Sequence, residues 1–392
     1  MSRRRAAVAA TALLGAVLLS AAILDRPVPT MPAAGHARAA GPVTADAMMQ
    51  WFNDAFLMQS SGSGYYRLTT AGGLASFFKQ TEMIEMTEDA YQRSGDPAYE
   101  AMISVLYRGL VTHHGADWLR NPSNDDLMWA AIMCLRAYHI TADKAYLRQA
   151  KSTFDRTYAR AWSSALGGGL WNTTRRHSKN TCVNAPAVIA ASMLYQSLHD
   201  RSYLRKAKRM YRWLRTTLYD PTTGAVYDHV SPASGRGIAK RAALDRTAFT
   251  YNQGGFIGAA DLLYRITSER RYFTDALKAL RFTQDSLSIA GILKSEAAPN
   301  APGWASAGGF KGIFVRWASI FINDNHVQGY GPWFQLNATA VQSRLNDAGL
   351  MNEDWSAQTG TGTLSAFSCS SAVVLLQWYP PAASAGRPAA GH

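Results

Sequence analysis

The sequence predicts an all-α fold in which six helical hairpins close into an (α/α)6 toroid. First, a short pattern recurs four times: an acidic residue, a tyrosine three positions later, and a run with helical periodicity. The tyrosines of the four repeats are Tyr99, Tyr146, Tyr203 and Tyr272. A Ser, Thr or Asp before such a run is typical of a helix N-cap. Second, a helix that is apolar nearly all round precedes each later repeat, whereas the helices after the tyrosines carry Lys and Arg on one face. Each unit is therefore a buried helix, a tight turn and a surface helix.

The same pattern extends along the chain to six helices of each kind. Buried helices are expected near residues 75–93, 125–140, 184–199, 252–267, 309–322 and 364–378. Surface helices are expected near residues 43–60, 97–112, 143–158, 202–217, 271–286 and 329–346. An open helical solenoid is the alternative arrangement of such hairpins. No strand pattern competes strongly, although the segment around 225–229 could form a short hairpin.

The first forty residues are typical of an export signal. Three arginines at 3–5 precede an apolar run at 6–24, and small residues at 37–40 offer a cleavage site. An uncleaved anchor is the alternative, because the run is about long enough to span a bilayer. We expect 1–40 to be a signal peptide, 41–380 one catalytic domain and 381–392 a disordered tail. The protein would then be secreted, with no integral membrane domain after signal removal.

Charge and cysteine content limit the classes of partner. The formal net charge is +13, but it is spread evenly, and no basic-aromatic run indicates nucleic-acid binding. Cys134, Cys182 and Cys369 cannot all pair, and their spacing matches no zinc motif. We therefore predict no nucleic-acid partner and no metal, and we expect a monomer.

Two adjacent acids open the second buried helix. In an inner ring of parallel helices all the N-termini open on one face, and long connections lead into that face. Capping and the helix dipole explain one acid there, but Asp125 and Asp126 begin a helix that is otherwise apolar. Like charges this close raise one pKa, as a general acid and nucleophile pair requires. Neighbouring helical carboxyl groups lie roughly 5–7 Å apart, which slightly favours a retaining over an inverting glycosidase.

Five stretches of sequence, taken together, resemble a known family. They are NDDLMWAAIMCLRAYHIT, GGGLWN, KNTCVNAPAVIAASMLY, TYNQGGFIGAADLLY and GGFKGIFVRW, in this order. They closely resemble glycoside hydrolase family 76, the endo-α-1,6-mannanases and their fungal cell-wall transglycosidase relatives, over residues 45–380. The resemblance implies an (α/α)6 fold and a retaining double displacement without a cofactor. It also implies that Asp125 is the nucleophile and that Asp126 is the general acid/base.

The same stretches supply candidates for substrate binding. The family's Tyr-Asn-Gln-Gly and Phe-Lys-Gly motifs match residues 251–254 and 310–312. The resemblance implies that residues in and near these motifs line the rim of the binding site or support it. Helix capping is the alternative for Asn252, packing or surface charge for Arg316, and a solvated loop for Asp228. The full set of candidates is Trp171, Asn180, Asn184, Asp228, Tyr251, Asn252, Gln253, Lys311 and Arg316.

Three functions remain open at this point. The leading hypothesis is a secreted enzyme that hydrolyses α-1,6-linkages inside the backbone of an α-mannan polysaccharide or oligosaccharide. Transglycosylation would use the same two carboxylates, with a sugar acceptor in place of water. A catalytically idle toroid that binds surface glycans is the alternative from another class.

Overall fold

The computed structural model describes residues 43–232, 242–296 and 307–380. All of them belong to one compact unit. The predicted signal peptide at 1–40 and the predicted tail at 381–392 lie outside the described residues.

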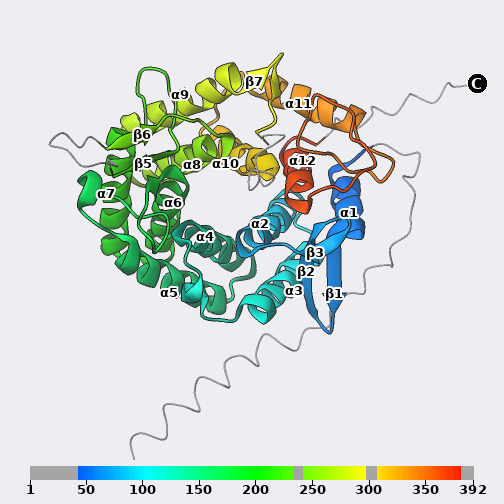
Figure 1. Ribbon diagram of the computed structural model, residues 1–392, viewed down its shortest axis with the longest axis horizontal. Helices are drawn as coiled ribbons and strands as arrows, with labels where there is room; N and C mark the ends of the chain where they lie inside the picture. Colours follow the sequence, from blue (N-terminus) through cyan, green and yellow to red (C-terminus); the bar gives the residue numbers. More distant parts are fainter. Residues whose placement is uncertain (1–42, 233–241, 297–306, 381–392) are drawn as a thin grey trace, which may run out of the picture. The chain divides into compact units, whose positions relative to one another are not determined.

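Twelve α-helices of the described residues form an inner and an outer ring (Figure 1). The inner helices are α2 (Phe77–Ser94), α4 (Asn124–Thr141), α6 (Thr181–Leu198), α8 (Thr250–Thr267), α10 (Phe310–Asp324) and α12 (Ala366–Trp378). The outer helices are α1 (Ala45–Phe56), α3 (Pro97–His114), α5 (Lys144–Ala161), α7 (Arg201–Thr217), α9 (Arg270–Ser286) and α11 (Gly331–Ser343). Because α12 packs against α2, the inner ring closes. The predicted toroid is confirmed, and the open solenoid is excluded.

The repeated acidic residues cap the outer helices as the sequence predicts. The side chains of Asp96, Asp143 and Asp200 each accept a hydrogen bond from a backbone N–H in the first turn of α3, α5 and α7. The fourth repeat differs, because Glu269 at the start of α9 makes no such side-chain bond. Such bonds satisfy N–H groups that have no partner within the helix, so the hairpin turns are set locally.

The tight turns between inner and outer helices each use a residue in the left-handed region. Gly95 ends α2 with φ +67°, whereas the corresponding residues after α4, α6 and α8 have side chains. Ala142, at φ +57°, has no side chain able to bond its own backbone. A non-glycine residue pays roughly 1–2 kcal/mol for this conformation.

Replacing Ala142 by glycine is therefore expected to raise the free energy of unfolding by about 0.5–1 kcal/mol, after the greater freedom of glycine in the unfolded chain is deducted. Urea unfolding followed by circular dichroism measures the change. The matched control is Ala159→Gly on the exposed face of α5, which should instead lose about 0.5–1 kcal/mol. Equal losses for both variants would contradict the argument.

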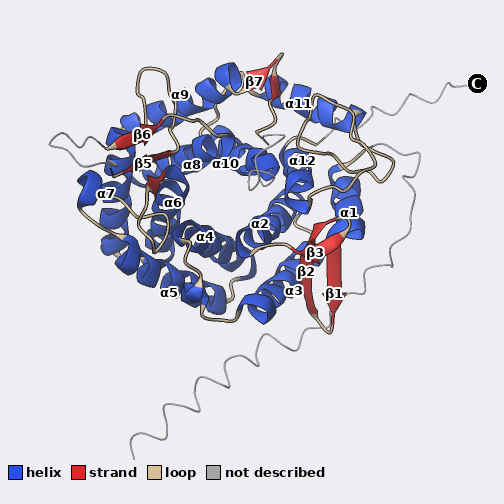
Figure 2. Ribbon diagram, in the orientation of Figure 1, coloured by secondary structure: helices blue, strands red, loops and turns tan. Residues whose placement is uncertain are grey.

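Short strands decorate the helical rings, and the sequence pattern did not reveal most of them (Figure 2). An antiparallel meander of β1 (Leu57–Ser60), β2 (Ser63–Thr69) and β3 (Gly72–Leu74) links α1 to α2. The surface helix expected at 43–60 therefore ends at Phe56. The buried hydroxyl of Tyr66 in β2 donates to Asn53 at 3.0 Å, which anchors the meander on α1.

A second antiparallel sheet lies among the long connections. Its strand order is β4 (Lys179–Asn180), β5 (His229–Ser231) and β6 (Ala243–Asp245). The chain does reverse near the expected hairpin, where Tyr219 bridges Val226. The main strand, however, begins at His229 and pairs on one side with the distant β4, which precedes α6, and on the other with the next strand, β6. A third pair, β7 (Ser288–Ile289) and β8 (Ile292–Leu293), follows α9.

A buried ion cluster crosses the interior of the inner ring. It consists of four acids of α2 and one arginine each from α4 and α10: Glu82, Glu85, Glu88, Asp89, Arg136 and Arg316. In the ring α10 packs against α8 and α12, so its arginine reaches past α12 to contact α2. Burial raises the pKa of Glu82 to about 8 and that of Glu88 well above its usual range. With those two acids protonated, two carboxylates balance two guanidinium groups.

Candidate active site

The adjacent acids lie in the first turn of α4, where the inner helices begin. Two connections hold this helix end. The amide of Asn124 donates to the backbone oxygen of Trp171 at 2.7 Å and accepts from Arg160 at 2.7 Å. The backbone N–H of Asn124 donates to the oxygen of Asn172. The start of α4 is thus fixed to the loop after α5, and Asp125 and Asp126 stand half-buried beside it.

The two carboxylates have different partners. Asp126 Oδ2 accepts a hydrogen bond from Asn121 Nδ2 at 2.8 Å. Asp125 Oδ2 faces the thiol of Cys182 at 3.5 Å, and its Oδ1 has no hydrogen-bond partner among the described residues. Among side-chain contacts, Asp125 is thus the less strongly hydrogen-bonded of the two acids.

Burial changes how the pair titrates. Burial, and then the charge of Asp126, raises the pKa of Asp125 to about 8. Burial also raises the pKa of Asp126, against the opposing effect of the Asn121 hydrogen bond. Because each charge disfavours the other, the two groups titrate as a pair, and near neutral pH the pair keeps one proton. One ionised and one protonated carboxyl are what glycoside cleavage by two acids requires.

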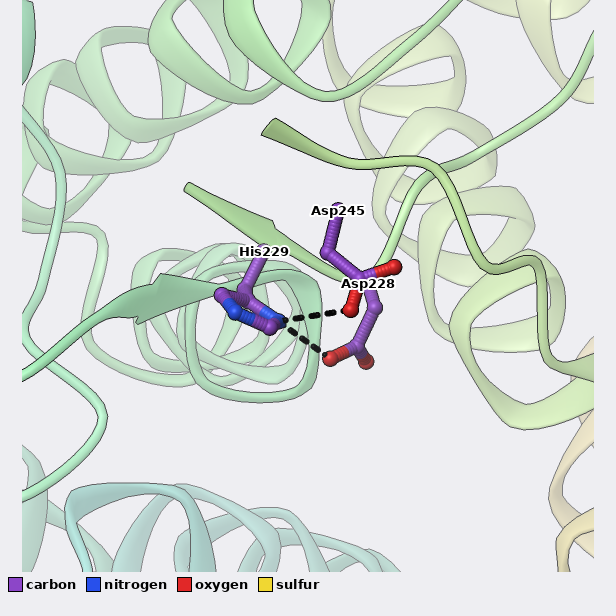
Figure 3. Close-up of side chains that lie close together, drawn as sticks. All are labelled: Asp228, His229 and Asp245. Carbon is purple, nitrogen blue, oxygen red and sulfur yellow. Dashed lines mark hydrogen bonds and ion pairs between the residues drawn. The ribbon is translucent and has the colours of Figure 1, made fainter. Parts of the chain in front are cut away.

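A second polar group surrounds Asp228, which directly precedes β5 (Figure 3). Asn252 donates to its Oδ1 at 3.0 Å, and His229 Nδ1 lies 2.8 Å from its Oδ2. Asn180 reaches the same Oδ2 at 3.5 Å. Asp245 lies 3.8 Å from His229 across the β5–β6 pairing. Asp228 is thus held by partners on three elements and is not a solvated loop residue.

The atoms of Asp228, His229 and Asp245 that could ligate a metal lie within 4.8 Å of one another. It is the one such group within residues 43–232, 242–296 and 307–380. However, the 2.8 Å separation of His229 from Asp228 is a hydrogen-bond distance, and Asn252 occupies the other oxygen. The arrangement fits a hydrogen-bonded carboxylate and imidazole. The predicted lack of a metal stays a prediction.

Tyr251 and Cys182 connect the two polar groups. The ring of Tyr251 stacks on Phe310 with centroids 3.9 Å apart. Burial, with the neighbouring Cys182 and Asp228, raises the pKa of Tyr251 well above its usual range, so the phenol stays protonated. The Cys182 thiol also lies 3.3 Å from Asn172 Oδ1. Cys182 lies in the first turn of α6, and the spacing of the cysteines in the sequence did not indicate this contact with Asp125.

Three further candidates make contacts that hold loops in place. Asn184 is fully buried and bonds both the N–H and the C=O of Leu170. Gln253 is also buried and donates to the backbone oxygen of Val226 at 3.2 Å. Trp171 is 6 % exposed and lies under the ammonium group of Lys179. These contacts hold the loops around residues 170 and 226 in place.

Two candidates are not at the rim. Lys311 is fully buried, donates to the backbone oxygen of Glu353 and lies 4.2 Å from the centre of the Trp355 ring; burial lowers its pKa to about 7. Arg316 is 1 % exposed and belongs to the ion cluster, so surface charge does not explain it. Because their polar groups are bound within the protein, both are support residues and not rim residues.

A closed double ring of helices with two adjacent carboxyl groups where an inner helix begins fits a glycoside hydrolase that acts through paired acids. Comparison with known families gives the same class. The model of glycosyl hydrolase family 76 matches residues 36–378, and the chain belongs to this family. The expected resemblance and the expected enzyme class are confirmed.

Solved structures of relatives share the fold over most of the chain. The GH76A α-1,6-mannanase of Salegentibacter sp. HEL1_6 is 29% identical, with a TM-score of 0.76, covering 86% of this chain and 97% of that one. An inactive variant of that enzyme, with two consecutive aspartates changed to asparagine, was solved with α-1,6-mannotriose. The Lin0763 protein from Listeria innocua is 25% identical, with a TM-score of 0.76, covering 86% and 95%.

No curated protein matched the sequence. Within the described residues, no helix has the length and apolar character needed to cross a membrane.

Proposed function

We propose that this protein is a secreted, retaining glycoside hydrolase that cleaves α-1,6-mannosidic linkages within mannan backbones. The observation that carries the proposal is the half-buried pair of Asp125 and Asp126 in the first turn of α4, whose pKa values burial raises. The inactive Salegentibacter variant supports it, because two consecutive aspartates were replaced there and the bound ligand is an α-1,6-mannooligosaccharide. Asp125 and Asp126 are the only consecutive aspartates in this sequence.

The proposed mechanism is a double displacement. Asp125 attacks the anomeric carbon while Asp126 gives its proton to the leaving glycosidic oxygen. Asp126 then takes a proton from a water molecule, which attacks the same carbon and releases Asp125. Two inversions at one carbon give net retention. Asp228, Asn252, Asn180 and Tyr251 are the proposed sugar-binding groups.

This assignment requires the shared proton to sit on Asp126 when substrate is bound. In the unliganded site burial favours the proton on Asp125 instead, since its pKa is raised to about 8. The hydrogen bond from Asn121 leaves the other oxygen of Asp126 available to a glycosidic oxygen. Proton transfer within the pair on binding would make Asp125 the ionised nucleophile. The opposite assignment of roles is tested in the Discussion.

Product analysis tests the function. The purified protein is incubated with linear α-1,6-mannan and, separately, with α-1,2- and α-1,3-linked mannooligosaccharides. We expect shortened oligomers from the α-1,6-linked substrate alone, with the α-anomer as the first product seen by proton NMR. The β-anomer as first product would overturn retention. Chains longer than the input would indicate transglycosylation. Binding of mannan without turnover would indicate a glycan-binding toroid.

The raised pKa of Asp125 predicts the alkaline limit of activity. Catalysis needs one proton on the pair, and that proton is lost as the pH rises through about 8. We therefore expect kcat/KM on α-1,6-mannotetraose to fall above pH 8, approaching tenfold per pH unit. Circular dichroism at pH 9 checks that the fold is retained. A profile that stays flat from pH 6 to 9 would contradict the proposed protonation state.

Secretion is tested by fractionation. If residues 1–40 are removed during export, the mature protein in the culture medium should begin near residue 41. Recovery of the full-length chain in the membrane fraction would instead indicate an uncleaved anchor.

A further inference from the structure

Positive charge gathers on one half of the outer ring. The neighbouring outer helices α5, α7 and α9 together contain sixteen lysines and arginines and three aspartates. Helices α11, α1 and α3, which form the other half of the outer ring (Figure 1), together contain one arginine and three acids. The even spread of charge expected from the sequence is therefore wrong for the outer ring, because the fold places the three basic helices side by side.

Ion pairs neutralise only part of this charge. Asp155 lies between α5 and α7, where it pairs with Lys151 and Lys206. Asp275 of α9 is buried and pairs with Arg215 of α7. On the solvent side, however, the three helices expose twelve lysines and arginines and one acid. The exposed surface of these helices, called here the basic face, therefore carries a large excess of positive charge.

Four arginines of α7 form a stripe at the centre of the basic face. Arg201, Arg205, Arg209 and Arg212 are all exposed, and their spacing places them on one side of the helix. At a rise of about 1.5 Å per residue, the stripe is about 17 Å long. Arg209 stacks on the ring of Trp162, 3.9 Å from its centre. The other three have no carboxylate partner among the described residues, since the ion pairs of α7 are made by other side chains of the helix.

The basic face lacks the apolar surface that a protein or a lipid partner would need. Among the described residues, the exposed large hydrophobic side chains lie outside α5, α7 and α9; they are Leu68, Leu74, Ile289 and Leu336. The apolar side of α7 packs on α6, so it is not available to enter a bilayer. Protein interfaces and membrane-bound amphipathic helices both depend on such apolar contacts.

The chemistry of the exposed side chains favours a hydrated polymer with phosphate groups. Nine of the twelve exposed cations are arginines, and a guanidinium group can bond a phosphate through two parallel N–H groups. Single-stranded nucleic acids also require exposed rings on which bases stack. No aromatic residue of α5, α7 or α9 is exposed. A polysaccharide with repeated phosphodiester groups therefore matches this face best.

We propose that the basic face binds a phosphodiester-containing polysaccharide of a cell envelope, with the arginine stripe of α7 at the centre of the contact. The outer helices form the wall of the ring, whereas Asp125 and Asp126 lie at the end of an inner helix. A polymer bound along the wall thus leaves the acid pair accessible and holds the enzyme beside envelope glycans. Only the choice of an envelope polymer rests on the proposed function, through secretion.

Binding to immobilised poly(glycerol phosphate) tests the proposal. The dissociation constant is measured by biolayer interferometry over a series of salt concentrations. The test variant combines Arg201→Gln, Arg205→Gln and Arg212→Gln, which lowers the net charge by three on the basic face. The control variant lowers it by the same amount at three exposed positions on or just before α11, in the other half of the ring, through Gln328→Glu, Gln335→Glu and Thr339→Glu.

The arginine variant should bind at least about tenfold more weakly, and the slope of log Kd against log salt should fall by about two to three, as expected for three lost phosphate contacts. The control should bind within about twofold of the parent, because its new charges lie beyond the Debye length of about 10 Å. Both variants should keep the parent's rate on α-1,6-mannotetraose.

Three results would overturn the proposal. Equal losses in the two variants would mean that net charge alone drives binding. Tighter binding to anionic lipid vesicles or to duplex DNA would assign the face to another partner. A parent protein that does not bind the phosphate polymer would remove the interaction altogether. The assay needs no turnover, so its result is independent of the proposed catalytic function.

Discussion

Replacement of Asp125 by alanine is expected to lower kcat on α-1,6-mannooligosaccharides by roughly 10³-fold or more and to leave the fold intact. Removal of the nucleophile stops formation of the glycosyl-enzyme intermediate. The side chain contributes little to stability, because one oxygen is unpaired and the other meets only a thiol. Loss of a buried, poorly satisfied carboxylate leaves stability unchanged or raises it.

The measurements are initial rates on α-1,6-mannotetraose and thermal unfolding of both proteins. Asp347→Ala is the matched control, since Asp347 is an exposed aspartate away from the acid pair. It should retain the parent's rate and melting temperature. An active Asp125→Ala enzyme would refute the paired-acid mechanism.

Azide separates the roles of the two acids. In the Asp125→Ala variant, azide should enter the space of the missing nucleophile and give the β-mannosyl azide in a single inversion. In Asp126→Ala, a glycosyl fluoride, whose leaving group needs no proton, should still form the intermediate on Asp125, and azide should attack that intermediate and give the α-azide. The reverse pattern would assign the nucleophile to Asp126, as the protonation of the unliganded pair would favour.

Replacement of Arg316 by methionine is expected to lower the free energy of unfolding by about 3–5 kcal/mol. Its guanidinium bonds Glu82 at 2.9 Å and Asp89 at 2.8 Å, and all three side chains are buried. Methionine fills a similar volume but leaves the ionised Asp89 with Arg136 as its one charged partner in the ion cluster. A buried carboxylate that loses a charged partner recovers little of its lost hydration.

Urea unfolding at pH 7 measures the effect. Arg205→Met, on the exposed face of α7, is the control and should change stability by less than about 0.5 kcal/mol. Adding Asp89→Asn to Arg316→Met should recover part of the lost free energy of unfolding, because it removes the negative charge that has lost Arg316 as a partner. No recovery, or equal effects of the two arginine variants, would mean that packing alone explains Arg316.

Local patterns in the sequence determined the helices and the position of the acid pair. Asp96, Asp143 and Asp200 cap helices by accepting hydrogen bonds from residues only two positions later. Such local signals do not depend on the rest of the fold. The apolar character of α4 and α6 likewise predicted burial, because a helix without a polar face cannot stand in water. Asp125 and Asp126 stood out because they are two acidic residues at the start of a helix that is otherwise apolar.

Tertiary structure alone decided which distant residues meet. Cys182 reaches Asp125 across 57 positions, and Arg316 reaches Glu82 across 234. The motif that placed Lys311 and Arg316 near the rim could not show that the ring buries both, because the charges that neutralise them come from other helices. The meander at 57–74 was also missed, since its strands are short and they pack against α1 and α3, which other parts of the sequence form. The periodicity of apolar residues predicts which face of a helix is exposed to solvent. Which residue pairs with a buried charge depends instead on how the helices pack when the ring closes.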